Sequence, residues 1–290
     1  MTSYYIGIDG GGTQCRAILV NAQGETLATA KGGPANIVRD AARARESVLT
    51  VCKSALSQSG LGLAMSDVVV CAGLAGANIP QAKAAFLQWP HPFRTLYVIS
   101  DLHAACLGAH GGRDGAVLVC GTGSAATCFA NGRFTDTGGH GFMLGDMASG
   151  AWLGLEAVRH TLMAMDALIP MDSLAQKVCE YLHVNADFDL VAAVSDYQSN
   201  DYAALAPEVV RLARAGDPAS ERLLQSGSDY LSAVATRMLD GNALPLAFVG
   251  GLSGVYQTRL PAHVQSRIIT PEDSPEKGAV AFAVRQQTRT

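Results

Sequence analysis

The chain has 290 residues, of which 49% are hydrophobic and 16% are charged, and its formal net charge is −4. This length and apolar content allow a large buried core and predict two domains of a soluble globular protein. The net acidity and the lack of a long Lys/Arg run exclude a nucleic-acid-binding surface, and no apolar run reaches the roughly 20 residues of a membrane span.

The start of the chain and its cysteines predict a cytoplasmic location. The sequence enters a strand at Tyr4 without a signal-like region. The seven cysteines are scattered and include no Cys-x-x-Cys pair. We therefore expect reduced thiols that behave mostly as small buried apolar residues.

The first elements are two short strands, residues 4–8 and 16–20, joined by a glycine-rich hairpin loop. This loop, Asp9-Gly-Gly-Gly-Thr13, combines three glycines with a carboxylate and a hydroxyl. Successive glycines let backbone N–H groups converge on an anion, and a carboxylate suits the accompanying cation. The loop is a candidate site for a magnesium-bound polyphosphate, although a hairpin without a ligand explains the same residues.

Strands and helices then alternate through the first half. A third strand over 26–30 and a helix over 41–56, closed by Gly60, come first. The following elements are a strand at 68–71, a helix at 80–89, a strand at 96–99 and a helix at 102–109. This order predicts an α/β fold with a mixed sheet. Asp101 lies between the last strand and the last helix, where it is either a site residue or the N-cap of that helix.

The second half begins as the first does, with strands at 116–120, 124–130 and 133–137. Gly121-Thr-Gly-Ser124 lies in the first hairpin and Asn131-Gly132 in the second. This recurrence indicates two similar halves around one nucleotide. The residues from Gly121 also have the spacing of a dinucleotide-binding fingerprint, but that motif opens a helix, whereas a strand is predicted here.

Helices and two further glycine-rich loops complete the chain. Gly138-Gly-His-Gly141 and Gly145-Asp146 form one loop, and Ser149 is a suitable N-cap for the helix after it. Asp217-Pro218 opens a long helix, and a strand over 246–249 runs into Gly250-Gly-Leu-Ser-Gly254. Ser274-Pro275 caps the last helix. We expect a domain hinge near Gly111-Gly112.

Taken in order, these motifs resemble the N-acetylglucosamine and glucosamine kinases of the BadF/BadG/BcrA/BcrD ATPase family, within the superfamily of actin, Hsp70 and hexokinase. The resemblance spans nearly the whole chain. It implies a two-lobed actin-like, ribonuclease H-like α/β fold with a duplicated mixed sheet. The lobes would comprise residues 1–112 and 113–290, with the active site in the cleft between them and the last helix, 275–287, packing back on the first lobe.

The resemblance also implies ATP-dependent phosphorylation of a hexosamine at its 6-hydroxyl, with ATP and Mg²⁺. Asp101 would be the catalytic base and Asp9 would hold Mg²⁺ through water. The residues implied to bind ATP are Gly10, Gly11, Gly12, Thr13, Gly121, Thr122, Gly123, Ser124, Gly250, Gly251 and Ser253. Those implied to contact the sugar are Asn36, Asp101, Gly138, Gly139 and Asp146.

One departure and two alternatives stay open. Met147-Ala148 stands where the family often has Glu-Gly, so the choice between N-acetylglucosamine and glucosamine as the sugar is open. The oligomeric state, a monomer or a homodimer, is open as well. The main alternative is an ATPase activator of a radical reductase or dehydratase, of the BadF type, whose second phosphate loop typically reads Gly-Gly-Gln-Asp. A sugar-responsive repressor of the same superfamily would need a DNA-binding helix-turn-helix, which the sequence lacks.

Overall fold

A computed structural model describes residues 3–240 and 243–288 of the chain. Its contacts divide the chain into two compact units. Unit 1 comprises the chain up to Val117, Thr127–Thr135 and the chain from Thr270 onward, and unit 2 comprises Leu118–Ala126 and Asp136–Ile269. The contacts thus divide the chain at four points. The expected lobes, residues 1–112 and 113–290, would divide the chain at a single point, and that division stays a prediction.

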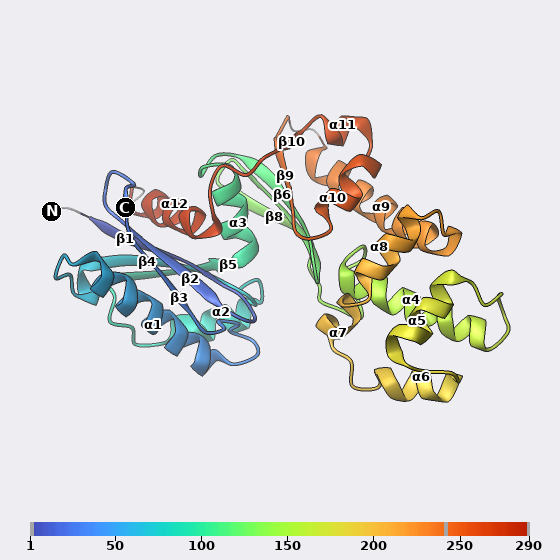
Figure 1. Cartoon of the computed structure of the whole chain (residues 1–290). Coiled ribbons are helices and arrows are strands. Elements are labelled where there is room, and N and C mark those ends of the chain that lie inside the picture. Colours follow the sequence, from blue (N-terminus) through green and yellow to red (C-terminus); the bar gives the residue numbers. More distant parts are fainter. Residues whose placement is uncertain (1–2, 241–242, 289–290) are drawn as a thin grey trace. The chain divides into compact units, whose positions relative to one another are not determined.

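The first sheet has five strands in the order β3-β2-β1-β4-β5 (Figure 1). Its strands are β1 (Tyr4–Gly10), β2 (Cys15–Val20), β3 (Thr26–Gly32), β4 (Val68–Leu74) and β5 (Thr95–Ser100). The pairs β1–β2 and β2–β3 are antiparallel, whereas β1–β4 and β4–β5 are parallel. The prediction of three antiparallel strands and then a mixed α/β sheet is confirmed.

Helices cover both faces of this sheet (Figure 1). Helix α1 (Ala41–Ser59) packs against β2 and β3, and helix α12 (Pro275–Gln287) packs against β1, β4 and helix α3 (Asp101–Ala109). Alternation along β1 decides which residue meets which helix. Ile6 and Ile8 join a buried cluster with Val48 of α1. Gly7 faces α12, because a Cβ atom there would lie 1.9 Å from the carbonyl oxygen of Glu276.

Local capping explains several helix ends in unit 1. Asp40 caps α1 by accepting the N–H of Arg43, and Gly60 ends that helix at φ 66°, in the left-handed region. Helix α2 (Pro80–Leu87) ends two residues before the predicted Trp89. Ser274 occupies the N-cap position of α12, but its side chain makes no capping hydrogen bond, which corrects that prediction in part.

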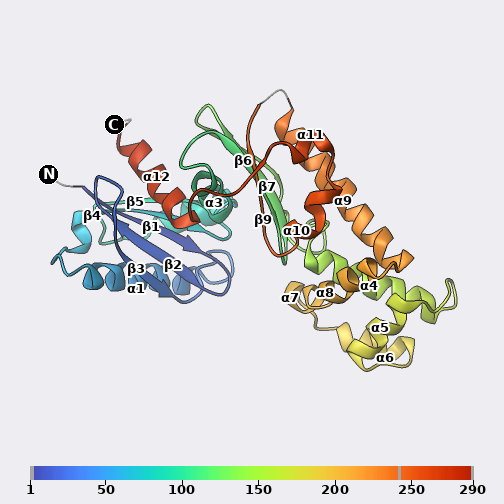
Figure 2. The ribbon, with the colours of Figure 1, turned by 45° about the horizontal axis from the view of Figure 1, so that its top comes forward.

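The second sheet also has five strands, in the order β10-β9-β6-β7-β8, and Figure 2 labels β9, β6 and β7. These are β6 (Gly115–Cys120), β7 (Ser124–Ala130), β8 (Arg133–Gly138), β9 (Leu246–Val249) and β10 (Ile268–Ile269). Asn131 and Gly132, at φ 52° and 78°, make the predicted hairpin turn. Gly121–Gly123 leads into strand β7 and not into a helix, which excludes the dinucleotide-binding fingerprint.

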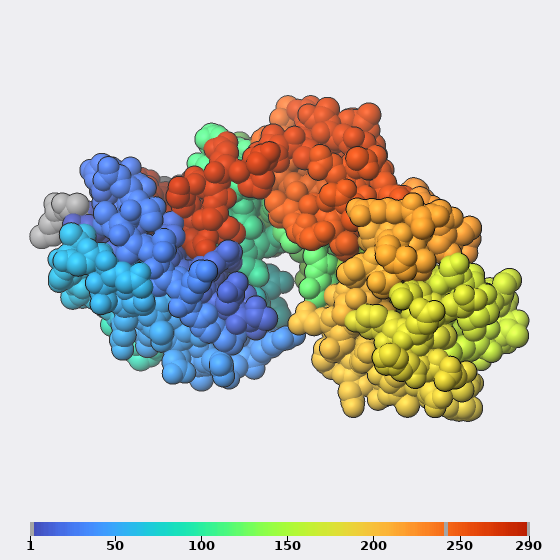
Figure 3. Space-filling model, in the orientation of Figure 1, coloured from blue at the N-terminus to red at the C-terminus, as the bar shows by residue number. Residues whose placement is uncertain are grey.

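The remaining part of unit 2 is mostly helical, and its α5 and α6 form the yellow surface in Figure 3. Its helices are α4 (Gly150–Met165), α5 (Ser173–Leu182), α6 (Asp187–Val194), α7 (Ser199–Ala203), α8 (Ala206–Arg214), α9 (Pro218–Leu239), α10 (Ser253–Tyr256) and α11 (Ala262–Gln265). There are also two 3-10 turns, η1 (Met65–Asp67) in unit 1 and η2 (Gln257–Arg259) in unit 2. Ser149 caps α4 and Asp217 caps α9, as predicted. Within the two described ranges, no helix is both long and apolar enough to cross a membrane.

The cysteines lie where the sequence predicted them. All seven are free thiols, six are buried and Cys179 is partly exposed. Burial raises the pKa of Cys15 to about 11 and that of Cys120 to about 12. These thiols are therefore protonated near neutral pH and unreactive, as expected of small core residues.

Candidate active site

In unit 1 the predicted site residues meet at one edge of the first sheet. The parallel strands β1, β4 and β5 are in register at their carboxyl ends, where Gly10 pairs with Leu74 and Leu74 with Ser100. The glycine loop leaves β1 at this edge, and Asp101 follows β5. Carboxyl ends of parallel strands are where open α/β sheets bind ligands.

The first glycine loop is held from behind by two backbone hydrogen bonds. Ala75 N donates to the carbonyl oxygen of Gly10 and Ala35 N to that of Gly11, each at 2.8 Å. The N–H of Gly11 is used inside the turn, since it donates to Gln14 O at 3.0 Å. Gly12 and Thr13 at the tip are exposed. The tip is therefore the part of this loop best placed to meet an anion.

Asp9 has a direct partner in the opposite strand. Asp9 and Arg16 are register partners in the β1–β2 hairpin, and Arg16 Nη2 lies 2.7 Å from Asp9 Oδ2. Arg16 Nε also lies 2.9 Å from Oε1 of Glu276, in the first turn of α12. Burial raises the pKa of Asp9, against the lowering effect of Arg16. The loop carboxylate thus belongs to a three-residue ion-pair network.

Asp101 is the first residue of α3 and not its N-cap. Ser100 is the cap, because its Oγ accepts the N–H of His103 at 3.1 Å. This finding overturns the alternative that Asp101 serves as the cap. Burial raises the pKa of Asp101, and the nearby charge of Asp9 adds to the rise. A carboxyl group whose pKa is raised toward working pH is better suited to accept a proton.

Asn36 lies beside the first glycine loop. It forms an isolated parallel bridge with Ala75, whose N–H donates to Gly10 O. Its Oδ1 accepts the N–H groups of Val38 and Arg39, each at 3.0 Å. The side-chain oxygen therefore stabilises the turn after Asn36, and the amide N–H₂ is the group that can donate to a ligand.

In unit 2 the second glycine loop, Gly121–Ser124, joins β6 to β7 and packs against the start of α4. Gly150 N donates to Gly121 O at 2.8 Å and Ala151 N to Thr122 O at 3.1 Å. Ser124 is buried, and its Oγ donates to Met147 O at 2.7 Å. Thr122 is exposed at the tip. The hydroxyl of Thr122 is thus free to face a ligand, whereas that of Ser124 supports the neighbouring loop.

The third glycine turn is joined to the end of β6. Leu252 N donates to Cys120 O at 3.0 Å, and Ser253 Oγ donates to Gly250 O at 2.8 Å. Gly250 has φ 107°, and a Cβ atom there would lie 2.2 Å from Cys120 O. Only glycine fits this position. The close approach of Gly250 to Cys120, together with the hydrogen bond from Leu252, brings Gly251 near Gly121.

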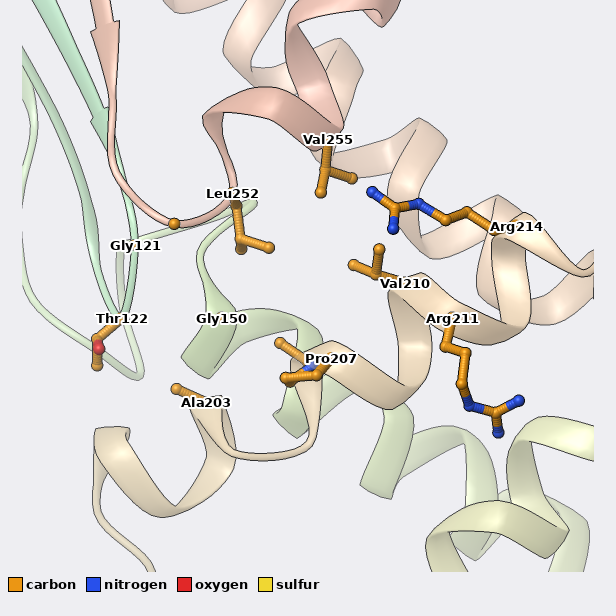
Figure 4. Close-up of a pocket in the computed structure, with 12 residues that line it drawn as sticks. Gly121, Thr122, Gly150, Ala203, Pro207, Val210, Arg211, Arg214, Leu252 and Val255 are labelled. Carbon is orange, nitrogen blue, oxygen red and sulfur yellow. The ribbon is translucent and has the colours of Figure 1, made fainter.

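These two turns and α8 enclose a pocket of about 620 Å³ (Figure 4). Pro207 and Val210 of α8 face Leu252 and Val255 across it, and Arg214 lies at the end away from Gly121 and Thr122. The volume and the apolar walls suit a flat heterocycle with a polar tail. The α8 residues were not among the predicted site residues, because nothing local in the segment Ala206–Arg214 marks a pocket.

The loop over 138–148 carries the predicted sugar residues. Six of its residues have positive φ: Gly138, Gly139, Gly141, Met143, Asp146 and Ala148. The Asp146 carboxylate accepts backbone N–H groups of Gly141 and Ser124, while burial raises its pKa. Cys120 Sγ donates to Ala148 O at 3.3 Å. Asp146 and its neighbours therefore tie this loop to the second glycine loop.

The predicted site residues form two groups, one in each unit. Unit 1 brings together Asp9, the first glycine loop, Asn36 and Asp101, and unit 2 brings together the other two glycine turns and the loop of Asp146. The sequence analysis missed Arg16 and Glu276. Arg16 could have been found by counting opposite residues across the hairpin, whereas Glu276 meets Arg16 only through tertiary packing.

Comparisons with known proteins agree on one family. The sequence profile of the BadF/BadG/BcrA/BcrD ATPase family matches residues 6–283. The glucosamine kinase of Vibrio cholerae is 35% identical over 97% of this chain and 96% of its own. The N-acetyl-D-glucosamine kinase of Dictyostelium discoideum is 27% identical over 98% of both chains. A crystal structure from Chromobacterium violaceum, provisionally described as an N-acetylglucosamine kinase, is 32% identical, has a TM-score of 0.86 and covers 97% of this chain and 99% of its own.

Proposed function

We propose that this chain, which belongs to the BadF/BadG/BcrA/BcrD ATPase family, is a kinase that transfers the γ-phosphoryl group of ATP to the 6-hydroxyl of an amino sugar. One observation carries the proposal. Asp101 directly follows Ser100, which is in register through Leu74 with Gly10 of the first glycine loop, so Asp101 and this loop lie at the same sheet edge. The names of the full-length relatives support an amino sugar as the acceptor.

Phosphoryl transfer needs a positioned nucleophile, a proton acceptor and neutralisation of the phosphate charge. Asp101 accepts the proton of the sugar 6-hydroxyl as that oxygen attacks the γ-phosphorus. The tips of the two glycine loops, Gly12-Thr13 and Thr122-Gly123, donate to phosphate oxygens. The apolar pocket beside Gly121 and Gly251 holds the nucleoside. Asp101 and the two glycine loops belong to the same chain, so the proposed mechanism needs no residue from a second copy of the protein.

Mg²⁺ fits the donor set of unit 1 as an ion held mainly by water and phosphate. In the described part of the chain, no group of three His, Cys, Asp or Glu residues could hold a metal. Asp9 offers one carboxylate, and Mg²⁺ in kinases is commonly bound by one or two carboxylates together with substrate phosphates. When bound, the ion neutralises charge on the phosphates. Asp9 would hold the ion through its water shell. A cytoplasmic location is part of the proposal, since ATP and Mg²⁺ are available there.

Each unit offers groups suited to sugar hydroxyls. These are the Asn36 amide and Asp101 in unit 1, and Asp146 with Gly138 and Gly139 in unit 2. Glucosamine is the acceptor favoured by the relative at 35% identity, and N-acetylglucosamine is the other candidate. Met147-Ala148 replaces the Glu-Gly often found in the family, which removes one carboxylate near the sugar loop.

The experiment is a panel of acceptors. ADP release is measured with Mg-ATP and glucose, glucosamine, N-acetylglucosamine or N-acetylmannosamine, with no-sugar and no-magnesium controls, and the position of the phosphate is read by NMR. We expect a colourless protein that makes a hexosamine 6-phosphate. ATP hydrolysis independent of sugar, in a brown, iron-containing preparation, would instead identify an activator of a radical enzyme. Six of the seven cysteines are buried, which argues against that alternative.

A further inference from the structure

Three charged side chains meet on the α12 side of the first sheet. Arg16 bridges two carboxylates, with Nη2 at 2.7 Å from Asp9 Oδ2 and Nε at 2.9 Å from Glu276 Oε1. Glu276 is only 4% exposed. Its other oxygen, Oε2, is buried and has no hydrogen-bond partner among the described residues.

Packing places Glu276 at this point. The first turn of α12 lies directly on β1, where a Cβ atom at Gly7 would be 1.9 Å from Glu276 O and 2.7 Å from Val280 Cγ2. Gly7 and Asp9 are two residues apart in the strand, so both face α12. The helix therefore delivers the Glu276 side chain to the same face as Asp9 and its cross-strand partner Arg16.

A buried carboxylate with an unpartnered oxygen is costly for folding. Apolar side chains of similar volume in place of the whole ion pair would commonly be as stable or more stable. Stability therefore does not explain Glu276, and its charge calls for another reason.

The charge of the network supplies that reason. Two carboxylates and one guanidinium leave the network with a net negative charge. Without the Glu276 charge, Arg16 would neutralise Asp9, and the loop would lose its attraction for a cation. With it, Arg16 is shared between two acids and Asp9 keeps a negative field at the mouth of the glycine loop.

We propose that Glu276 is a positioning residue for the first phosphate loop: by holding Arg16 through Nε, it keeps the neighbourhood of Asp9 negative and so strengthens the binding of magnesium-complexed nucleotide. This inference rests on the proposed use of Mg²⁺ and ATP. It does not depend on which sugar is phosphorylated.

The test is the affinity for ADP, measured by titration calorimetry with and without Mg²⁺, in the wild type and in Glu276→Gln. Removing one charge from a partly exposed network should reduce the strengthening of ADP binding by Mg²⁺ by about three- to tenfold. The affinity for ADP without Mg²⁺ should stay within about twofold, and a thermal melt checks that the variant is folded. No sugar is needed, so this result is independent of the kinase assay.

Glu272→Gln is the matched control. It removes the same charge from another Arg–Glu pair of unit 1, the more exposed Arg113–Glu272 pair, and should leave the magnesium effect unchanged. The double variant Arg16→Gln/Glu276→Gln also removes the Arg16 charge, so that the network is again net negative, and it should restore the magnesium effect. If Glu276→Gln does not fold, Glu276→Met replaces it, with the same expected loss. An unchanged magnesium effect in the folded variant, or a double variant no better than the single one, overturns the proposal.

Discussion

At the scale of single residues, Asp101 allows chemistry and helix capping to be separated. Ser100 caps α3, and Asp101 Oδ1 accepts the N–H of Leu102 at 2.9 Å. Asp101→Asn keeps that acceptor and removes the proton acceptor. We expect kcat to fall by about 10²- to 10⁴-fold, the usual range for losing a general base, with an unchanged melting temperature. Steady-state ADP release and a thermal melt measure both.

Ser100→Ala is the reciprocal variant. It should lower stability by about 1 kcal/mol through the lost cap. Turnover of Asp101→Asn within threefold of wild type would show that the carboxylate takes no part in the reaction.

Ala148 occupies a backbone conformation that favours glycine. Its φ is 68°, in the left-handed region, and its side chain is fully buried. Ala148→Gly relieves strain of about 1–2 kcal/mol but loses a buried methyl worth about 0.8 kcal/mol and gains unfolded-state freedom. We expect a nearly unchanged free energy of unfolding, measured by urea denaturation.

Ala151→Gly is the control for this strain. Ala151 is equally buried but lies in the first turn of helix α4, so its methyl is lost without any relief. It should cost about 1–2 kcal/mol. Equal losses in the two variants would mean that Ala148 is not strained.

The places of these residues in the fold were predictable where local spacing determines them. The glycines at 10–12, 121, 123, 250 and 251 and the acid after β5 stand out because turns and strand ends have local rules. The inward direction of the Ser124 hydroxyl and the contact of Glu276 with Arg16 depend on partners far along the chain. No local rule contains that information.

At the scale of elements, α3 and α12 pack closely through glycine. A Cβ atom at Gly278 would lie 2.0 Å from Ala104 O and 2.3 Å from Gly108 N. Because the obstacles are backbone atoms, Gly278→Ala must push the helices apart. We expect a loss of about 1–3 kcal/mol or more, measured as a lower melting temperature.

Gly254→Ala serves for comparison. Gly254 lies in α10, and no heavy atom lies within 4 Å of the Cβ position. Alanine there should be neutral or slightly stabilising. A Gly278→Ala protein that melts together with Gly254→Ala would contradict the close packing.

The Asp146 carboxylate accepts backbone N–H groups that hold its loop, and we propose that it also binds the sugar. Asp146→Asn keeps an acceptor for the N–H groups of Gly141 and Ser124 but loses the charge. A charged acceptor is worth about 1.5–3 kcal/mol, so the KM for the sugar should rise about tenfold or more. The KM for ATP should stay within threefold. Asp146→Ala also removes support from the second glycine loop, so both constants should rise.

His140→Ala tests whether any change in this loop has the same effect. His140 is exposed in the same loop, and its removal should leave both Michaelis constants near wild type. An unchanged sugar KM in Asp146→Asn would place the sugar elsewhere.

Most elements were predictable because their signals are local. Asp40, Gly60, Ser149 and Asp217 mark helix ends as their types suggest. Helix α2 ends before Trp89 because Pro90 disfavours the helical conformation of the residue that precedes it, and Ser274 holds the N-cap position without a side-chain hydrogen bond. The α8 side of the pocket beside Gly121 and Gly251 was not predicted, because α8 reaches this pocket only through the tertiary fold.

At the scale of the whole molecule, unit 1 depends on a helix that follows unit 2 in the chain. Deletion of residues 275–290 uncovers the face of β1 at Gly7 and leaves Arg16 without Glu276. We expect limited proteolysis to cleave the truncated protein within residues 1–117 far faster than the full chain. Equal protection in both proteins would show that α12 is dispensable for unit 1.

The late position of α12 bears on how the protein is made. Strand β1 leaves the ribosome before unit 2, whereas the helix that covers its Gly7 face is synthesised only after unit 2. One face of the first sheet therefore stays uncovered while unit 2 is being synthesised. A polypeptide that ends before α12 carries both glycine loops and Asp101 yet lacks the covering helix and Glu276, so we expect its first sheet to be open to proteases and chaperones.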